Sequence, residues 1–238
     1  MNIDWQERTK LLLGDKHQKL VVSNVLVVGV GGVGGVVAEM LCRAGVGKIT
    51  IVDGDKIDIT NLNRQIFTSV SSVDKSKAYV LGEKLLSINS DLELIVIDKY
   101  IKDYEMVDLL KSDKFDYVVD AIDTLSPKVS LINSCFQLGL NIVSSMGSGG
   151  KLNPSLVEVA DISKSYNCPL ARIVRKRLHG LGVRSGVKVV FSPEKRVETS
   201  LKFVEQENKK TTLGTISYMP SIFGIYAAWV VIDDLTNI

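Results

Sequence analysis

A glycine-rich turn after an apolar run constrains the fold of this 238-residue chain more than any other feature. The run over Asn24–Val30 is rich in β-branched residues, which predicts a strand buried on both faces. A helix is predicted directly after the turn, from about Val33 to Ala44. Glycines let the backbone approach a ligand closely, and a helix N-terminus attracts negative charge. The unit therefore predicts a nucleotide phosphate site around Gly29, Gly31, Gly32 and Gly34.

Strand and helix signals alternate from this turn to about residue 150, which predicts an α/β fold. Repeated βα units with buried strands indicate a Rossmann-like, doubly wound and mostly parallel sheet. The alternation then stops, and we expect mixed or antiparallel strands to extend the sheet in the second half. The remaining expected strands are Ile49–Asp53, Leu92–Asp98, Tyr117–Asp123, Asn141–Met146, Leu156–Ile162 and Lys188–Ser192. The expected helices are Lys75–Asn89, Tyr104–Lys111, Pro127–Leu138, Leu170–Leu178 and Ser221–Leu235.

A single domain over residues 1–238 is the simplest organisation, because no internal repeat or low-complexity linker divides the chain. The last helix is apolar nearly all round, which predicts that it is buried. The uncharged stretch Thr211–Ile232 is long enough to span a bilayer, but glycine, proline and hydroxyl residues interrupt it and disfavour a membrane span. The charged segment Glu198–Lys210 is expected to be mobile.

Cysteine usage and the N-terminus favour a cytoplasmic protein. The three cysteines form no CxxC pair, so neither a zinc ribbon nor a redox dithiol is predicted. The first residues contain no apolar core of a signal peptide.

The formal net charge of +2 conceals an uneven distribution. Residues 163–210 hold twelve Lys or Arg and four acids, a net charge of +8, which leaves −6 for the rest. A basic segment on an acidic body is typical of a protein that binds a polyanion. The alternative interpretation is that these charges only form a solvated loop and helix surface. Four of these cations lie on the predicted helix Leu170–Leu178: Arg172, Arg175, Lys176 and Arg177.

Polar residues follow the ends of successive strands in an order that suits a nucleoside triphosphate better than NAD. They are Asp53, Asp55, Asn61, Arg64, Gln65, Lys77 and Asp123. An acid at the position of Asp53 binds ribose hydroxyls, and an arginine such as Arg64 forms bidentate contacts to phosphate oxygens. Asp123 ends a strand at the same carboxyl edge of the sheet, where an acid facing phosphates is best explained by Mg²⁺.

These motifs resemble those of the E1-like adenylating enzymes, the MoeB/ThiF/HesA superfamily, over about residues 8 to 150. The resemblance implies a mixed eight-stranded sheet, a homodimer, and attack of a carboxylate on the α-phosphate of ATP. It implies that Asp53 holds the ribose, that Asp123 holds Mg²⁺, and that the phosphates are held by Asn61, Arg64 and Lys77. It also implies that Arg8 reaches into the partner subunit's site as an arginine finger. The implied catalytic residues are Arg8, Arg64, Lys77 and Asp123.

The second half is similar to one branch of that superfamily, the tRNA threonylcarbamoyladenosine dehydratases. The similarity lies in Asp120-Ala-Ile-Asp123, in Pro127-Lys128, and in the segment from Gly147 to Pro154. Members that activate ubiquitin-like carrier proteins usually have two CxxC zinc pairs and a downstream cysteine, which this sequence lacks. We interpret Cys168 as an ordinary thiol.

This resemblance implies ATP-dependent dehydration of N6-threonylcarbamoyladenosine in tRNA. Residues 8–150 would form the ATP-binding half, and residues 151–238 would face the tRNA. The basic helix would contact the anticodon arm of the tRNA. No DNA partner is expected, and a sulfur-transfer protein is a further candidate partner. One alternative is an adenylyltransferase for a ubiquitin-like sulfur carrier, and a second is a redox enzyme that binds NAD on the same glycine turn.

Overall fold

A seven-stranded sheet forms the centre of the computed structural model, which describes residues 5–197, 201–206 and 209–237. Its strand order is β3-β2-β1-β4-β5-β7-β6, and only β6 runs antiparallel to its neighbour. The strands are β1 (Asn24–Val28), β2 (Lys48–Val52), β3 (Glu93–Ile97), β4 (Tyr117–Asp120), β5 (Ile142–Ser145), β6 (Glu158–Asp161) and β7 (Lys188–Phe191). The predicted doubly wound, mostly parallel sheet is confirmed. Among the described residues this sheet has seven strands, where the resemblance implied eight.

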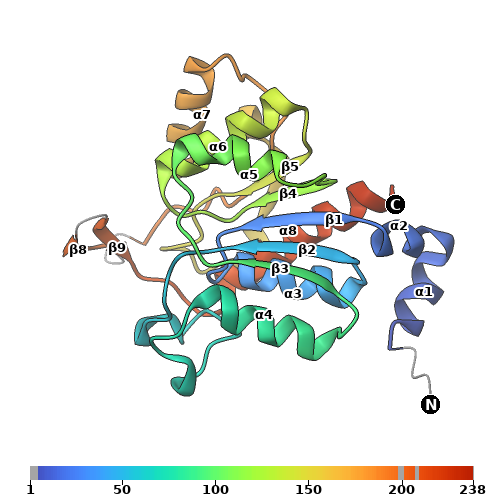
Figure 1. Cartoon of the computed structure of the whole chain (residues 1–238). Coiled ribbons are helices and arrows are strands. Elements are labelled where there is room, and N and C mark those ends of the chain that lie inside the picture. Colours follow the sequence, from blue (N-terminus) through green and yellow to red (C-terminus); the bar gives the residue numbers. More distant parts are fainter. Residues whose placement is uncertain (1–4, 198–200, 207–208, 238) are drawn as a thin grey trace.

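Helices cover both faces of the sheet (Figure 1). One face packs against α3, α4 and α8, and the other against α5, α6 and α7. Within the described residues the helices are α1 (Glu7–Leu13), α2 (His17–Val21), α3 (Gly34–Ala44), α4 (Lys77–Ile88), α5 (Met106–Lys111), α6 (Leu125–Leu138), α7 (Pro169–Gly180) and α8 (Tyr218–Thr236). α6 begins two residues before Pro127, whose missing N–H costs nothing in a first turn.

Strand β1 shows how the sequence produces these two layers. Side chains alternate across a strand, so Val25 and Val27 join the core beneath α3 and α8. Leu26 and Val28 join the core beneath α5 and α6. All four are buried, and a strand with two buried faces must be apolar throughout.

A β-hairpin occupies the segment that we expected to be mobile. Its strands are β8 (Leu201–Gln206) and β9 (Lys209–Leu213), while residues 198–200 and 207–208 lie outside the described residues. Gly150 forms hydrogen bonds to the segments on both sides of the hairpin. Its carbonyl accepts from Val197 N at 3.0 Å, and its N–H donates to Gly214 O at 2.8 Å. The hairpin projects from the body at the left of Figure 1.

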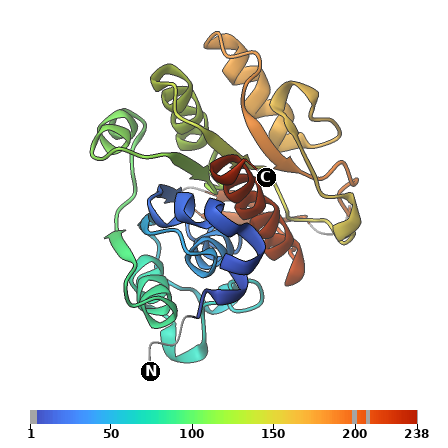
Figure 2. The same ribbon diagram turned by 90° about the vertical axis from the view of Figure 1, so that its right-hand side faces the viewer.

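Helix α8 crosses one face of the molecule beside α1 and α2 (Figure 2), and it packs against α3, β5 and α2. Met219, Phe223 and Ala227 are fully buried, which confirms the predicted buried C-terminal helix. The outward side of α8 is apolar as well, with Ile225 and Trp229 exposed. In the part of the chain that the structure describes, no helix has the length and apolar character needed to cross a membrane.

Candidate active site

The glycine turn connects β1 to α3 in a conformation that only glycine adopts easily. Gly29 has a φ of +86°, and its N–H donates to the carbonyl of Val52 at 2.8 Å. A Cβ on Gly34 would stand 1.8 Å from the carbonyl oxygen of Gly29, so α3 could not begin so close to the turn with any other residue. The first N–H groups of α3 therefore lie at the carboxyl edge of the sheet, where they attract anions.

Asp53 ties the loop after β2 to the glycine turn. Its Oδ2 accepts from Val30 N at 2.7 Å, and its Oδ1 accepts from Asp55 N at 2.8 Å. Burial raises the pKa of this carboxyl above its ordinary value, and the positive charge of Lys77 partly opposes that shift. Each carboxylate oxygen can accept a second hydrogen bond, so this acid beside the glycine turn keeps acceptor capacity for a ligand hydroxyl.

Asp55 lies between a lysine and a tyrosine at the same edge. Lys77, the first residue of α4, is nearly buried, and its Nζ lies 2.5 Å from Asp55 Oδ2. The hydroxyl of Tyr100 donates to Asp55 Oδ1, which raises the pKa of Tyr100 to about 12. Tyr100 follows β3 and was missed from the sequence, because no local pattern distinguishes it from a surface tyrosine.

The segment from Asn61 to Gln65 lies against the glycine turn. Asn61 is buried at the end of a short 3-10 helix, Ile59–Asn61, and its Oδ1 caps that helix by accepting from Asp58 N at 3.2 Å. Gln65 is 4% exposed, and its Nε2 lies 3.7 Å from the position of a Cβ on Gly31. Its Oε1 has no hydrogen-bond partner among the described residues. A buried acceptor in this state is typical of a site that a ligand or water completes.

Arg64 and Asp123 come together at the mouth of the site. Arg64 Nη1 donates to Thr60 O at 2.8 Å and to Asn63 Oδ1 at 2.9 Å. Burial lowers the pKa of Arg64, while the charges of Asp123 and Asp58 oppose that shift. Asp123 is exposed after β4 and also acts on Tyr100, so it lies within electrostatic range of both sides of the site. An exposed carboxylate beside cations suits Mg²⁺ when phosphates are bound there, because Mg²⁺ commonly takes one or two carboxylates together with phosphate oxygens.

The carboxyl ends of β1, β2, β3 and β4 thus surround one site that contains a glycine turn, the half-buried acid Asp53, the cations Arg64 and Lys77, and the exposed acid Asp123. The profile of the ThiF family matches residues 6–238. The chain belongs to the ThiF family. This confirms the superfamily resemblance, and the match extends well beyond residue 150, where the motifs of the ATP-binding half end.

Two tRNA threonylcarbamoyladenosine dehydratases align with almost the whole chain, and a carrier-protein adenylyltransferase aligns with little more than half of it. A "tRNA threonylcarbamoyladenosine dehydratase" of Bacillus subtilis is 35% identical over 237 residues, which are 96% of this chain and 93% of that protein. The crystal structure of Escherichia coli tRNA N6-threonylcarbamoyladenosine dehydratase, TcdA, in complex with ATP matches with a TM-score of 0.88 and 31% identity, over 98% of this chain and 95% of that one. The "Sulfur carrier protein ThiS adenylyltransferase" of Escherichia coli is 31% identical over 140 residues, 58% of this chain and 55% of that protein.

Arg8 is separated from this site within the ThiF-family protomer. It is exposed on α1, which precedes β1 and lies with α2 near the amino ends of the strands. The site lies at the opposite, carboxyl edge of the sheet. The two ends are seen at the right and the left of Figure 1. The predicted role of Arg8 as an arginine finger therefore requires a second subunit.

Helix α7 presents a basic face to solvent. Ala171, Val174 and Leu178 form its buried stripe, whereas Arg172, Lys176 and Arg177 are exposed. Arg175 differs from them, because its Nη1 donates to the carbonyl and the hydroxyl of Ser165, both at 2.7 Å. This guanidinium holds the preceding loop, so three of the four predicted cations, Arg172, Lys176 and Arg177, are exposed on α7.

Tyr100→Phe is expected to weaken ATP binding modestly. Without the tyrosine hydroxyl, Asp55 depends more strongly on Lys77, and this cation becomes less available to phosphates. Since Tyr100 is 67% exposed, we expect the Kd for ATP to rise only about threefold. Titration of ATP into the purified variant would measure the change, with Tyr104→Phe, a neighbouring exposed tyrosine, as the matched control. Equal ATP affinity in both variants would contradict a role for Tyr100.

Proposed function

We propose that this chain is an ATP-dependent dehydratase that cyclises N6-threonylcarbamoyladenosine in tRNA. The observation that carries the proposal is the extent of similarity: 96% of the chain aligns with a protein of that name, against 58% for the carrier-protein adenylyltransferase. An alignment over 96% of the chain includes most of the second half, residues 151–238. The adenylyltransferase for a ubiquitin-like sulfur carrier stays the second candidate.

In the proposed reaction, the threonyl carboxylate attacks the α-phosphate of ATP, and pyrophosphate leaves. A nitrogen or oxygen of the substrate's own carbamoyl group then attacks the acyl carbon as AMP departs, and in either case the group loses one N–H proton. One carboxylate oxygen leaves with AMP, so the nucleoside loses the elements of one water. The nucleophile belongs to the substrate, and no enzymic thiol is required. Cys42, Cys135 and Cys168 are accordingly all buried.

The residues of the site have distinct roles in this proposal. Asp53 accepts hydrogen bonds from the ribose, and the buried Gln65 completes the pocket beside the glycine turn. Arg64, Lys77 and Asn61 bind phosphates, for which Lys77 exchanges its partner Asp55. Asp123 holds Mg²⁺, which when bound neutralises phosphate charge. Rate acceleration comes mainly from positioning and from electrostatic stabilisation of charge that develops at the α-phosphate.

We further propose that the active form is a homodimer. Large apolar side chains are exposed on α1 and α8, including Leu11 and Leu12 at 80% and 84% and Trp229 at 53%. Exposed apolar groups of this size commonly belong to interfaces between subunits. A dimer would also bring Arg8 to the partner's nucleotide. Such an enzyme would work in the cytoplasm, where its tRNA substrate is found.

A mass measurement of the nucleoside tests the proposed function directly. Enzyme, Mg-ATP and modified tRNA are incubated together, and the tRNA is digested and analysed by mass spectrometry. We expect the mass of one water to be lost, with AMP and pyrophosphate formed in equal amounts. Pyrophosphate exchange that requires a carrier protein ending in Gly-Gly, without any change in the tRNA, would favour the second candidate. Tighter binding of NAD than of ATP would favour the redox alternative.

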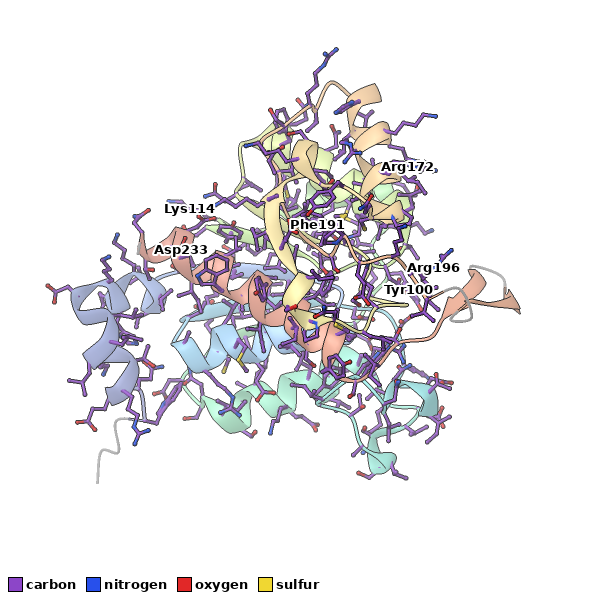
Figure 3. All side chains as sticks on the ribbon, turned by 180° about the vertical axis from the view of Figure 1, so that it is seen from behind. Tyr100, Lys114, Arg172, Phe191, Arg196 and Asp233 are labelled. Atoms are coloured by element: carbon purple, nitrogen blue, oxygen red, sulfur yellow. The ribbon has the colours of Figure 1, made fainter. Side chains whose placement is uncertain are left out.

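The exposed cations of α7 provide a test of tRNA binding. Arg172 and Arg196 lie toward the same end of the molecule as Tyr100 and the hairpin (Figure 3), so a tRNA on this face would lie near the nucleotide site. Reversing the charges at Arg172 and Arg177 should weaken tRNA binding. The slope of log Kd against log salt should fall by about one for each phosphate that the helix no longer neutralises. ATP affinity should stay unchanged.

Charge reversal at Arg175 is the matched comparison for that experiment. Because Arg175 holds the Ser165 loop, its replacement by glutamate should lower the melting temperature, whereas the α7 surface variants should keep it. An unaltered salt slope in the surface variants would contradict RNA contact by this helix.

A further inference from the structure

A fully buried ion pair lies beneath the carboxyl edge of the sheet. Asp120, the last residue of β4, and Lys128 of α6 are both 0% exposed, and Lys128 Nζ lies 2.6 Å from Asp120 Oδ2. The same Nζ donates to the carbonyl of Ser145 at 2.9 Å and to the hydroxyl of Ser144 at 3.3 Å. Ser144 also donates to Asp120. One ammonium group therefore joins α6 to the ends of two adjacent strands.

Stability alone does not explain this pair. Removing two charges from water costs about as much free energy as their attraction returns, so apolar residues of similar volume would serve this core equally well. Neither Asp120 nor Lys128 reaches solvent, so neither can touch ATP or tRNA. Any effect on the reaction must pass through the backbone that the pair holds in place.

That backbone carries the candidate active site. Asp120 Oδ1 accepts from Ile122 N at 3.1 Å, which fixes the turn leading to Asp123. The same turn packs against the glycine turn, because a Cβ on Gly29 would stand 2.8 Å from the carbonyl oxygen of Ala121. A displacement of this turn would therefore move the proposed magnesium-binding acid relative to the glycine turn.

The other strand held by Lys128 leads to the second half of the chain. Ser145 is the last residue of β5, and the segment Gly147–Gly150 follows it toward the base of the hairpin. Lys128 thus lies at the junction between the ATP-binding half and the half proposed to face tRNA. Its bonds to Asp120 and Ser145 hold the end of β4 beside the end of β5, the strand that leads into the second half.

We propose that Lys128 is a positioning residue, which aligns the turn carrying Asp123 with strand β5 for the adenylation step. This inference rests on the proposed function, in which Asp123 holds Mg²⁺ and ATP lies on the glycine turn. Misplacement of reacting groups by about 1 Å can cost about 100-fold in rate, and loss of a group that supports a metal ligand commonly costs about 10-fold in metal affinity.

The double variant Asp120→Asn with Lys128→Met tests the proposal, because it removes both charges and keeps both side chains close to their original size. We expect its melting temperature to stay within about 5 °C of the unaltered chain. We expect kcat for tRNA dehydration to fall about 100-fold and the half-saturating Mg²⁺ concentration to rise about 10-fold. The Kd for ATP should change less than about threefold, since no ATP-binding group is removed.

Val119→Ala is the matched control, since Val119 is a fully buried neighbour on the same strand that carries no charge. It should lower the melting temperature without changing the Mg²⁺ dependence. If the double variant does not fold, Ser144→Ala tests the proposal instead, because this substitution removes a hydrogen-bonding hydroxyl from the cluster and leaves both charges in place. We expect that variant to lose about fivefold in kcat and to require more Mg²⁺.

Unaltered kcat and Mg²⁺ dependence in the double variant, or in Ser144→Ala where the double variant does not fold, would overturn the role of Lys128. This conclusion applies when the protein without substitutions dehydrates modified tRNA. An unaltered chain that cannot dehydrate modified tRNA would instead refute the proposed function, so the two failures are distinguishable.

Discussion

Asp123→Ala should reduce Mg²⁺-dependent turnover by about 1000-fold, since a bound metal ion contributes several kcal/mol of charge stabilisation and each 1.36 kcal/mol is tenfold in rate. The fold should be retained, because the Asp123 side chain is exposed after β4 and lies outside the buried core. Formation of AMP at several Mg²⁺ concentrations measures the loss, and thermal unfolding checks the fold.

Asp91→Ala is a suitable control for this experiment, since Asp91 is an exposed aspartate that precedes β3 at the opposite edge of the sheet. Its turnover should equal that of the unaltered chain. Full activity in Asp123→Ala would show that Asp123 does not hold the ion, and the roles of Arg64 and Lys77 would then be reconsidered with it.

Arg8→Ala should lose most of its activity although Arg8 lies far from the nucleotide site of its own protomer. An arginine that stabilises transferring phosphoryl charge from outside a site can contribute about 1000-fold in rate, and we expect a loss of that order here. ATP binding to the resting enzyme should change little, because the site within the protomer is intact. Single-turnover formation of AMP measures the effect.

Mixed dimers distinguish a finger that acts across subunits from one that acts within its own protomer. Equal amounts of Arg8→Ala and Lys77→Ala chains are unfolded, mixed and refolded, so that about half of the dimers are mixed and each of these holds one complete site. The mixture should recover about a quarter of full activity. Lys77→Ala refolded alone should recover none. Failure of the mixture to exceed its two parents would refute a finger from the partner subunit.

The first half of the fold was predictable because its signals are local. The apolar run that begins at Asn24 predicted a strand with two buried faces, which the structure ends at Val28, and Gly29 and Gly34 form a turn too tight for side chains. Strand ends in a parallel sheet meet at one edge, so the order of Asp53, Arg64 and Asp123 along the chain was sufficient to place them together.

The rest of the site depends on contacts between distant segments, which no local pattern reveals. Tyr100 reaches Asp55 across 45 residues, and Arg175 turns back to Ser165 rather than outward to solvent. The hairpin β8–β9 resembles a mobile segment in the sequence, because its charges are typical of solvated loops. In the sequence, Lys128 is noticeable only as part of the Pro127-Lys128 motif, and no local pattern indicates that its side chain is completely buried.

The position of α8 has a consequence for how this protein is made. The helix lies 190 residues after β1 in the chain, yet its Met219 and Phe223 complete the same core as Val25 and Val27. During synthesis on the ribosome, that apolar face stays uncovered until the last of these residues has emerged. Protection of the nascent chain by a chaperone that binds apolar segments would therefore be needed for longest on this side of the sheet.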